Sequence, residues 1–536
     1  MPIVVGEIEF DPPTIHTVGL SLQILEGGNT STATVHVAYR RIGSFRWIEA
    51  FPLQRVRTDM LSAVVRTPFP IAEQFAGSIF DLNANDGYEV KLLISEGDGR
   101  RTLRTGTIHT RAEPPDNPAN PHMVAVDSDR TLAEALSSAN PGDVITLRAG
   151  TYTWPITLDR NGTVENPIIV RGTSPDRTVL EAIGAPHGVV ILASHVVIED
   201  MTIRGSVWGI RIDDADDVVV RHTIIEEVQY GIDGRSGLNR NFYLCDNVLE
   251  GNGVNWPDTS SRTWNYEGIV VTGTGHVICH NTLSGFGDAL GLSEPTVIPN
   301  RAIDFYGNDV LWGGDDGIEL DYTERNVRAF RNRLGNVGMG ISFQPIWGGP
   351  AYAFRNVIYN TANAPYKLNQ DPSGFHICHN TSIRSGWAWT QYGTFASNFF
   401  FYNNLTVGTY NGVDMTPVIQ LAHIDYNGWS PDGQFKFTQG WNGFKTLQEQ
   451  SPYEHHGILL TQPIFEHTIS IPPLFAAFMP PIDDAGLHDR SNAVDAGMLA
   501  PNINDHYTGH APDLGAIERD HAKIQYGVRR SHTSVH

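Results

Sequence analysis

The chain has 536 residues and a formal net charge of −22, and 40% of its residues are hydrophobic. This length is sufficient for two or more domains with a large buried core. The charge argues against nucleic acid or an anionic membrane as a partner, because binding phosphates requires clustered lysine and arginine. No apolar stretch is long enough to cross a bilayer, and 53 glycines with 32 prolines are typical of a turn-rich all-β protein.

Residues 1–113 consist of short alternating segments, such as Ala33–Tyr39 and Tyr88–Ile94, separated by glycine, asparagine and aspartate turns. This pattern predicts a β-sandwich, and it resembles a fibronectin type III module with Trp47 in the core. Residues 114–122 are polar and proline-rich and are interpreted as a linker.

Residues 123–536 are expected to form a second domain. Its first element, Thr131–Ala139, has the pattern of a short amphipathic helix that would cover the open end of a solenoid. Together with the later Asn166-Pro-Ile-Ile-Val-Arg, this opening resembles that of the polysaccharide lyases and their relatives with a right-handed parallel β-helix. After about residue 410 the chain is irregular, and Ala511–Glu518 resembles the closing segment of bacterial proteins with that fold.

Asparagines recur every 24 residues in the middle of the chain, and each ends a short apolar run. They are Asn308, Asn332, Asn356, Asn380 and Asn404, with Asn247 and Asn281 in similar positions upstream. A period of this length with short β segments predicts one coil of a parallel β-helix per repeat. Asparagine suits the bend because it tolerates the left-handed conformation, and stacked amides can form a hydrogen-bonded ladder. We therefore expect these side chains in one line, about 4.8 Å apart.

The three cysteines each lie two residues before one of these asparagines. The spacing allows Cys245 and Cys279 to lie on neighbouring coils, and Cys378 is several coils away. Because the count is odd, we interpret them as stacked thiols and not as a disulfide framework.

A second column begins with Gly-Ile or a similar pair once per coil, with the aliphatic residues inside and the intervening residues outside. When these strands are aligned, the outward positions are rich in acids. The first column holds Glu267, Asp288 and Asp316, with Asp315 at its edge. The second column holds Glu319, Ser342 and Lys367. The third column holds Asp321, Gln344 and Asn369. Crowded carboxylates raise one another's pKa or bind a cation, so the cluster predicts a functional site. For each acid alone, a turn carboxylate bonded to local backbone is the simpler interpretation.

Tryptophans flank this cluster, and we predict that Trp264, Trp312 and Trp347 form the walls of a sugar-binding cleft. Tryptophans that fill space beneath loops are the alternative. Arg328 belongs to a basic patch that would contact an acidic sugar or pair with neighbouring acids.

Gly314-Asp-Asp-Gly-Ile-Glu-Leu resembles the paired-aspartate motif of polygalacturonases at Asp315 and Asp316, without the rest of that signature. The favoured hypothesis is a secreted or extracellular glycoside hydrolase that acts on a polysaccharide without a required cofactor. Asp316 with Glu319 or Asp321 would supply the acid and the base or nucleophile, and Asp315 would orient water.

Two alternatives remain open. The first is a lyase or epimerase acting on uronate polymers, with Lys367 as the base and Ca²⁺ held by Asp316, Glu319 and Asp321. The second is a glycan-binding spike or adhesin without catalysis, because repetitive coils suffice to build a shaft.

Overall fold

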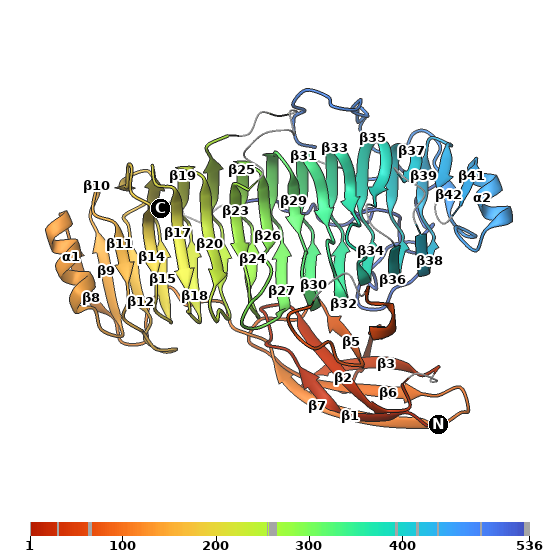
Figure 1. Cartoon of the computed structure of the whole chain (residues 1–536), viewed down its shortest axis with the longest axis horizontal. Helices are drawn as coiled ribbons and strands as arrows, with labels where there is room; N and C mark the ends of the chain where they lie inside the picture. Colours follow the sequence, from red (N-terminus) through yellow and green to blue (C-terminus); the bar gives the residue numbers. More distant parts are fainter. Residues whose placement is uncertain are drawn as a thin grey trace.

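The computed structural model describes residues 2–28, 32–62, 67–253, 256, 265–391, 395–413, 418–436, 439–482 and 485–529, with the backbone alone at 411–413. It is an elongated parallel β-helix with an N-terminal β domain against one side (Figure 1). The all-β class and the solenoid predicted from the sequence are confirmed.

The N-terminal domain is antiparallel and sandwich-like, with strand order β1-β2-β5-β4-β3-β6-β7. The strands are β1 (Val4–Phe10), β2 (Val18–Glu26), β3 (Thr34–Arg41), β4 (Ile48–Arg55), β5 (Gln74–Ile79), β6 (Gly87–Ser95) and β7 (Arg101–His109). Its core is aliphatic, with Leu22, Val37 and Val90 among its buried residues. The expectation that Trp47 is a core residue is wrong. Its ring is half-exposed, and Arg40 and Lys91 each lie 4.6 Å from the ring centroid.

Each coil as far as β29 has three short β segments. One coil contains β27 (Asn300–Tyr306), β28 (Asp309–Gly313) and β29 (Asp316–Glu319). Strands such as β27 form one sheet of 13 strands, which we call the base sheet, and the other two kinds form a bent sheet of 22 strands. We call the part containing β28 the first facet and the part containing β29 the second facet. In later coils a single long strand, such as β31 (Arg333–Ser342), spans both facets.

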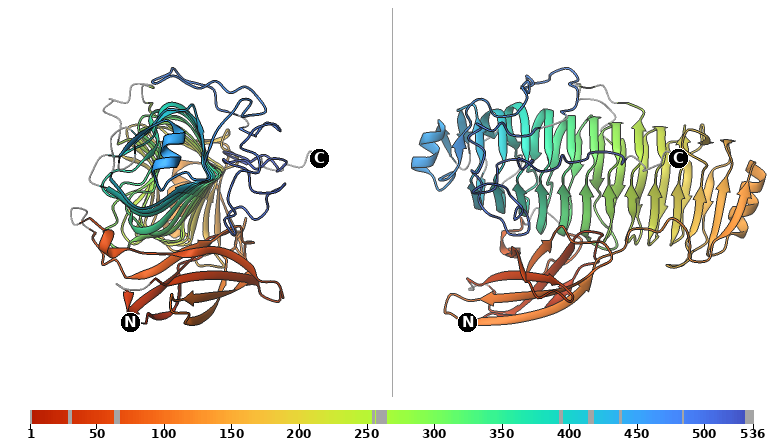
Figure 2. Two further views of the ribbon diagram at one scale, coloured as in Figure 1. Left: turned by 90° about the vertical axis from the view of Figure 1, so that its right-hand side faces the viewer. Right: turned by 180° about the vertical axis from the view of Figure 1, so that it is seen from behind.

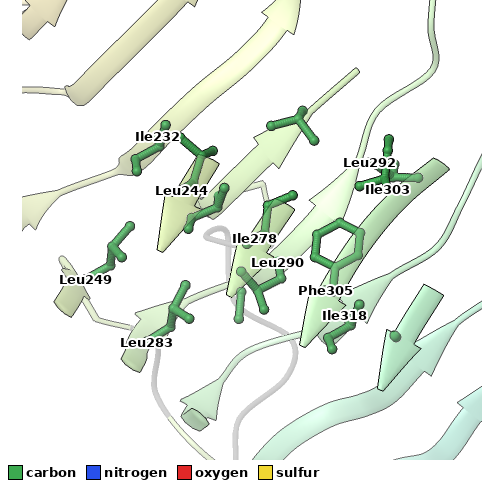
Figure 3. Packing of buried hydrophobic residues seen from close by; sticks show 14 of the residues in the cluster. Ile232, Leu244, Leu249, Ile278, Leu283, Leu290, Leu292, Ile303, Phe305 and Ile318 are labelled. Carbon is green, nitrogen blue, oxygen red and sulfur yellow. The ribbon is translucent and has the colours of Figure 1, made fainter. Parts of the chain in front are cut away.

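Aliphatic side chains fill the solenoid interior (Figure 3). The Gly-Ile column is confirmed, because parallel pairing stacks its inward residues coil upon coil. These residues are Ile232, Ile269, Leu290, Ile318 and Ile341.

The asparagine ladder predicted from the 24-residue period is present. The backbone N–H and Nδ2 of Asn308 both donate to Oδ1 of Asn332 at 3.0 Å, and the same pair of bonds repeats to Asn404. The ladder continues to Asn427 and ends on the buried carboxylate of Glu454. The predicted bend conformation is wrong by one residue, because the residue before each asparagine has the positive φ. The asparagine itself turns inward to form the ladder.

The cysteine prediction also needs correction. Cys245 lies opposite Cys279 in the parallel register, with 4.5 Å between their Cα atoms, and the two form a disulfide. Adjacent coils bring side chains in one column close enough for this bond. Cys378 is a buried free thiol.

Short helices lie at the two ends of the solenoid (Figure 1). The predicted cap is α1 (Asp129–Ser138), which buries Leu132 and Leu136 against the first coils and begins with a capping box at Ser128. The other is α2 (Phe444–Gln450). From about residue 458 the chain returns along the outside of the coils (Figure 2), and the guanidinium of Arg529 pairs with Asp246.

The protein's own segments occupy two of the three solenoid faces. The N-terminal domain contacts the base sheet, where Asp304 accepts hydrogen bonds from Thr14 and Thr17. The C-terminal segment packs Leu514 and neighbouring apolar residues on the first facet, against Leu405. Among the described residues, neither segment forms a polar contact with the outward side chains of the second facet. The predicted site residues lie mainly on that facet.

Candidate functional site

Parallel pairing along the second facet aligns the predicted outward columns. The strands concerned are β23 (Glu267–Val271), β26 (Asp288–Leu292), β29, β31 and β33 (Val357–Lys367). Glu267 lies opposite Asp288, and Glu319 lies between Gly291 and Ser342, which in turn lies opposite Lys367. The rung alignment made from the sequence therefore holds on these coils.

Three carboxylates converge on this facet. One oxygen from each of Asp288, Asp316 and Glu319 lies within 4.8 Å of the others, and we call this set the acid cluster. The backbone N–H of Asp316 donates to Oδ1 of Asp288 at 3.0 Å, which fixes two of the acids relative to each other. Gly291 leaves room for the third, because a Cβ there would lie 3.0 Å from Oε2 of Glu319.

Lys367 reaches the acid cluster from two coils away. Its Nζ lies 2.6 Å from Oδ2 of Asp316, whose side chain is fully buried. The other oxygen of Asp316, Oδ1, is buried and has no hydrogen-bond partner among the described residues. The cluster therefore holds one ammonium group and one unsatisfied carboxylate oxygen.

Burial and mutual repulsion disfavour the ionised acids here. Burial, and then the charges of Asp316 and Asp315, raises the pKa of Asp288 well above its usual value. The pKa of Glu319 is raised by burial and by Asp288, and the pKa of Asp315 rises to about 6 through burial and Asp316. For Lys367, burial favours the neutral amine, but the carboxylates outweigh it and raise its pKa. The site thus favours additional positive charge.

Asp321 lies beside the cluster in a hydrogen-bonded unit of its own. Its Oδ1 accepts from Ser342 Oγ at 2.7 Å and from the backbone N–H of Gln344 at 2.6 Å. Burial raises its pKa to about 7. The sequence grouped Asp321 with the cation ligands, whereas the three acids that converge include Asp288 in its place. Asn369 is buried two coils after Asp321.

Glu267, one coil before the acid cluster, is held in an ion pair. Arg235 forms an ion pair with it and also pairs with Asp233. Burial raises the pKa of Glu267 to about 7 despite this partner. The sequence analysis missed Arg235, although its position four residues after Gly231 marks it as lying near the outward side of this facet.

The predicted tryptophan walls are placed unequally. Trp312 is half-buried at the end of β28, on the bend beside Asp315. Trp347 is fully buried with its ring edge-on to Tyr322 at 5.6 Å, so its ring packs internally. Trp264 lies outside the described residues.

The structure does not bring Arg328 to the acid cluster. It lies on β30 (Thr323–Phe330) of the base sheet, fully buried against the N-terminal domain. Its guanidinium bonds to Asp304 and to Ser78. The basic patch pairs with neighbouring acids, the alternative left open by the sequence.

A cavity of about 390 Å³ lies elsewhere, between the N-terminal domain, the base-sheet edge and the C-terminal segment. Arg331 on its wall is bound to Asp81, and Asn502 bonds both Tyr39 and the backbone of Phe80. These contacts join the domains across the cavity, and it contains no convergent acids comparable to the acid cluster.

No protein-family model matches the chain. It is 23% identical over 431 residues to pectate lyase L of Dickeya chrysanthemi, which covers 74% of this chain and 87% of that protein. Pectate lyase L of Dickeya dadantii is likewise 23% identical, with 73% and 86% covered. A family 28 exopolygalacturonase from Yersinia enterocolitica aligns at a TM-score of 0.39 and 10% identity, with 81% of this chain and 98% of that one covered.

The fold and the similarity to the two pectate lyases indicate a polysaccharide-active protein of the parallel β-helix type, which degrades polysaccharide. Within the described part of the chain, no helix has both the length and the apolar character needed to cross a membrane.

Proposed function

We propose that the protein is a calcium-dependent lyase that cleaves a uronate polysaccharide by β-elimination, with Lys367 as the base. The observation that carries the proposal is the contact of Lys367 Nζ with the acid cluster, 2.6 Å from Asp316. The sequence alone favoured hydrolysis. The similarity to two pectate lyases supports elimination instead.

The residues present fit a calcium ion. Asp288, Asp316 and Glu319 each offer an oxygen ligand of the kind that calcium prefers, within 4.8 Å of one another. Oδ1 of Asp316 has no hydrogen-bond partner among the described residues and could coordinate the ion. These three side chains would hold the ion. When bound, calcium would neutralise the carboxylate of a uronate residue and so acidify the adjacent C–H bond.

Lys367 is suited to the proton transfer. Its side chain is 13% exposed, so it is largely shielded from water but is not fully enclosed by the protein. The carboxylates favour the ammonium form of Lys367, and neutralisation of these carboxylates by the cation that they would hold would lower the pKa of the amine again. In its neutral form, the amine takes the proton from the carbon next to the carboxylate. The electron pair left on carbon forms a C=C bond as the bond to the glycosidic oxygen breaks, and that oxygen leaves and takes up a proton.

Hydrolysis is the second candidate, and the pKa of Asp315 favours it. A carboxyl group with a pKa of about 6 beside Asp316 has the character of a general acid near neutral pH. In this reading Lys367 only neutralises Asp316, and metal removal leaves activity intact.

The test is turnover of polygalacturonate and alginate, followed by ultraviolet absorbance of the unsaturated product and by mass spectrometry. We expect Lys367→Ala to lose about 10²–10⁴-fold in kcat, as for removal of a general base. Lys445→Ala is the matched control, because that lysine is 86% exposed on α2. A chelator should abolish activity and added Ca²⁺ restore it. Saturated products released without metal would refute elimination.

A further inference from the structure

We infer that a column of aromatic side chains on the second facet forms an extended binding track for the polysaccharide, leading to the acid cluster. The column consists of His187 on β14 (His187–Ile191), Trp208 on β17 (Trp208–Asp213) and Tyr230 on β20 (Tyr230–Ser236). This inference rests on the proposed function, and it adds residues on coils that the acid cluster does not reach.

The register makes the column continuous with the site. His187 lies opposite Trp208, and Trp208 lies opposite Tyr230. Pairing of Ile232 with Ile269 then places Tyr230 opposite Glu267, the residue that pairs with Asp288. A chain lying along the solenoid axis over the rings would therefore run directly onto the acid cluster.

The rings form a connected stack. The centroids of His187 and Trp208 are 5.2 Å apart, and those of Trp208 and Tyr230 are 5.0 Å apart with ring planes only 10° from parallel. Tyr266, directly before Glu267, extends the stack at 6.2 Å from Tyr230. All four side chains are partly exposed.

The exposure of this column distinguishes it from the other outward aromatic columns. On the base sheet, Tyr352, His376 and Phe400 also stack coil upon coil. There the N-terminal domain covers them, since the ring of Phe51 lies 5.3 Å from His376 and Phe80 lies 5.3 Å from Tyr352. No described residue of the N-terminal domain or the C-terminal segment makes such a ring contact with the column on the second facet.

Charged groups beside the rings fit an acidic sugar chain. The guanidinium of Arg235 lies 5.6 Å from the ring centroid of Tyr230, and its side chain is 29% exposed. Arg211, on the coil of Trp208, pairs with Asp213 at 2.9 Å and is 31% exposed, so both arginines are also bound to acids of this facet. Aromatic surface suits sugar rings, and partly exposed guanidinium groups suit carboxylates, so the occupant with this chemistry is a uronate polymer.

Length dependence follows from the spacing of the coils. Trp208 lies four coils before Asp316, about 19 Å along the axis at 4.8 Å per coil. A short oligosaccharide bound at the acid cluster would not reach this ring, whereas a long chain would. The track should therefore affect polymer binding and leave the turnover of short substrates unchanged.

The experiment compares Trp208→Ala, Tyr230→Ala and the double variant with Phe45→Ala, whose side chain is 97% exposed on the N-terminal domain. Binding to long polygalacturonate and alginate is measured by affinity electrophoresis in a Lys367→Ala background, and KM for polymer and for short oligosaccharides in the active enzyme. We expect the double variant to bind the polymer about tenfold more weakly, with a matching rise in KM for polymer only. Circular dichroism and the single variants identify any loss of fold.

The outcomes separate the two proposals. Unchanged polymer binding and KM in a folded double variant would overturn the track even if elimination is intact. A wild type that binds polymer through these rings but releases no unsaturated product would remove the lyase and keep the track. A wild type that neither binds nor cleaves either polymer would remove both.

Discussion

Replacement of Asn356 by alanine tests how much the asparagine ladder contributes to stability. Its Oδ1 accepts two hydrogen bonds from Asn332 at 3.0 Å, and its Nδ2 donates to the carbonyl of Ala329 and to Oδ1 of Asn380 at 2.9 Å. All these groups are buried. The substitution removes four hydrogen bonds in a place that water does not reach.

The expected cost follows from the groups left behind. The backbone N–H of Asn332 loses its ladder partner, and an unsatisfied buried donor costs about 1–3 kcal/mol. Nδ2 of Asn332 keeps its bond to Phe305, and Oδ1 of Asn380 keeps the backbone N–H of residue 356, so these groups contribute less. With a small cavity added, we expect unfolding to become about 3–5 kcal/mol easier, a large part of the stability of a typical domain.

Urea unfolding followed by circular dichroism and tryptophan fluorescence measures this change. Asn252→Ala, at an exposed asparagine, is the matched control and should shift the midpoint by less than about 0.5 kcal/mol. Asn356→Asp keeps the shape but replaces the donating amide by oxygen against two acceptors, so it should be at least as destabilising as alanine. An Asp variant as stable as the wild type would refute the hydrogen-bond account of the ladder.

Three further changes test other parts of the structure. Burial raises the pKa of Glu454 to about 8 from an ordinary 4.5, so its contribution to stability is present below the ordinary pKa and is lost as the pH rises through about 8. Glu454→Gln should remove that loss in urea midpoints recorded from about pH 5 to about pH 9. Asp304→Ala leaves the buried guanidinium of Arg328 without its ion-pair partner and should lower the free energy of unfolding by about 3–5 kcal/mol, measured by calorimetry. Proteolysis between the domains should become faster, and unchanged proteolysis would contradict the role of this pair in domain docking. Cys245→Ser with Cys279→Ser opens a 34-residue loop and should lower stability by roughly 3–4 kcal/mol, whereas mass spectrometry that finds three free thiols in the wild type would disprove the bond.

Much of the solenoid could be predicted because its sequence pattern repeats from coil to coil. A single asparagine in a loop carries little information, but a constant separation of 24 residues requires equal coils, and equal coils fix the register of every strand between them. The same register then predicted which acids lie on one facet. The coil register predicts that Asp288, Asp316 and Glu319 lie near one another, and their carboxylates converge in the structure.

The features that could not be predicted depend on geometry within one coil or between distant segments. The positive φ falls on the residue before each asparagine because the ladder requires the amide inside, and a sequence pattern does not resolve a shift of one position. The sequence placed Cys245 and Cys279 in one column of the coils, but the odd number of cysteines did not indicate that these two would form a disulfide. The sequence left Arg328 between a role in substrate binding and pairing with neighbouring acids, because it did not show that the N-terminal domain covers the base sheet.

The choice between hydrolysis and elimination depends on one long side chain. The coil alignment put Lys367 two coils from Glu319, roughly 10 Å away, which left its role open. A lysine stem extends over several ångströms, and here it spans that gap to place Nζ 2.6 Å from Asp316. An ammonium in that position keeps Asp316 ionised, so in a hydrolytic mechanism Asp316 would be the base or nucleophile and Asp315 the acid. In the proposed elimination, the same side chain is an amine beside oxygens suited to a divalent cation, so activity after metal removal is the measurement that separates the two mechanisms.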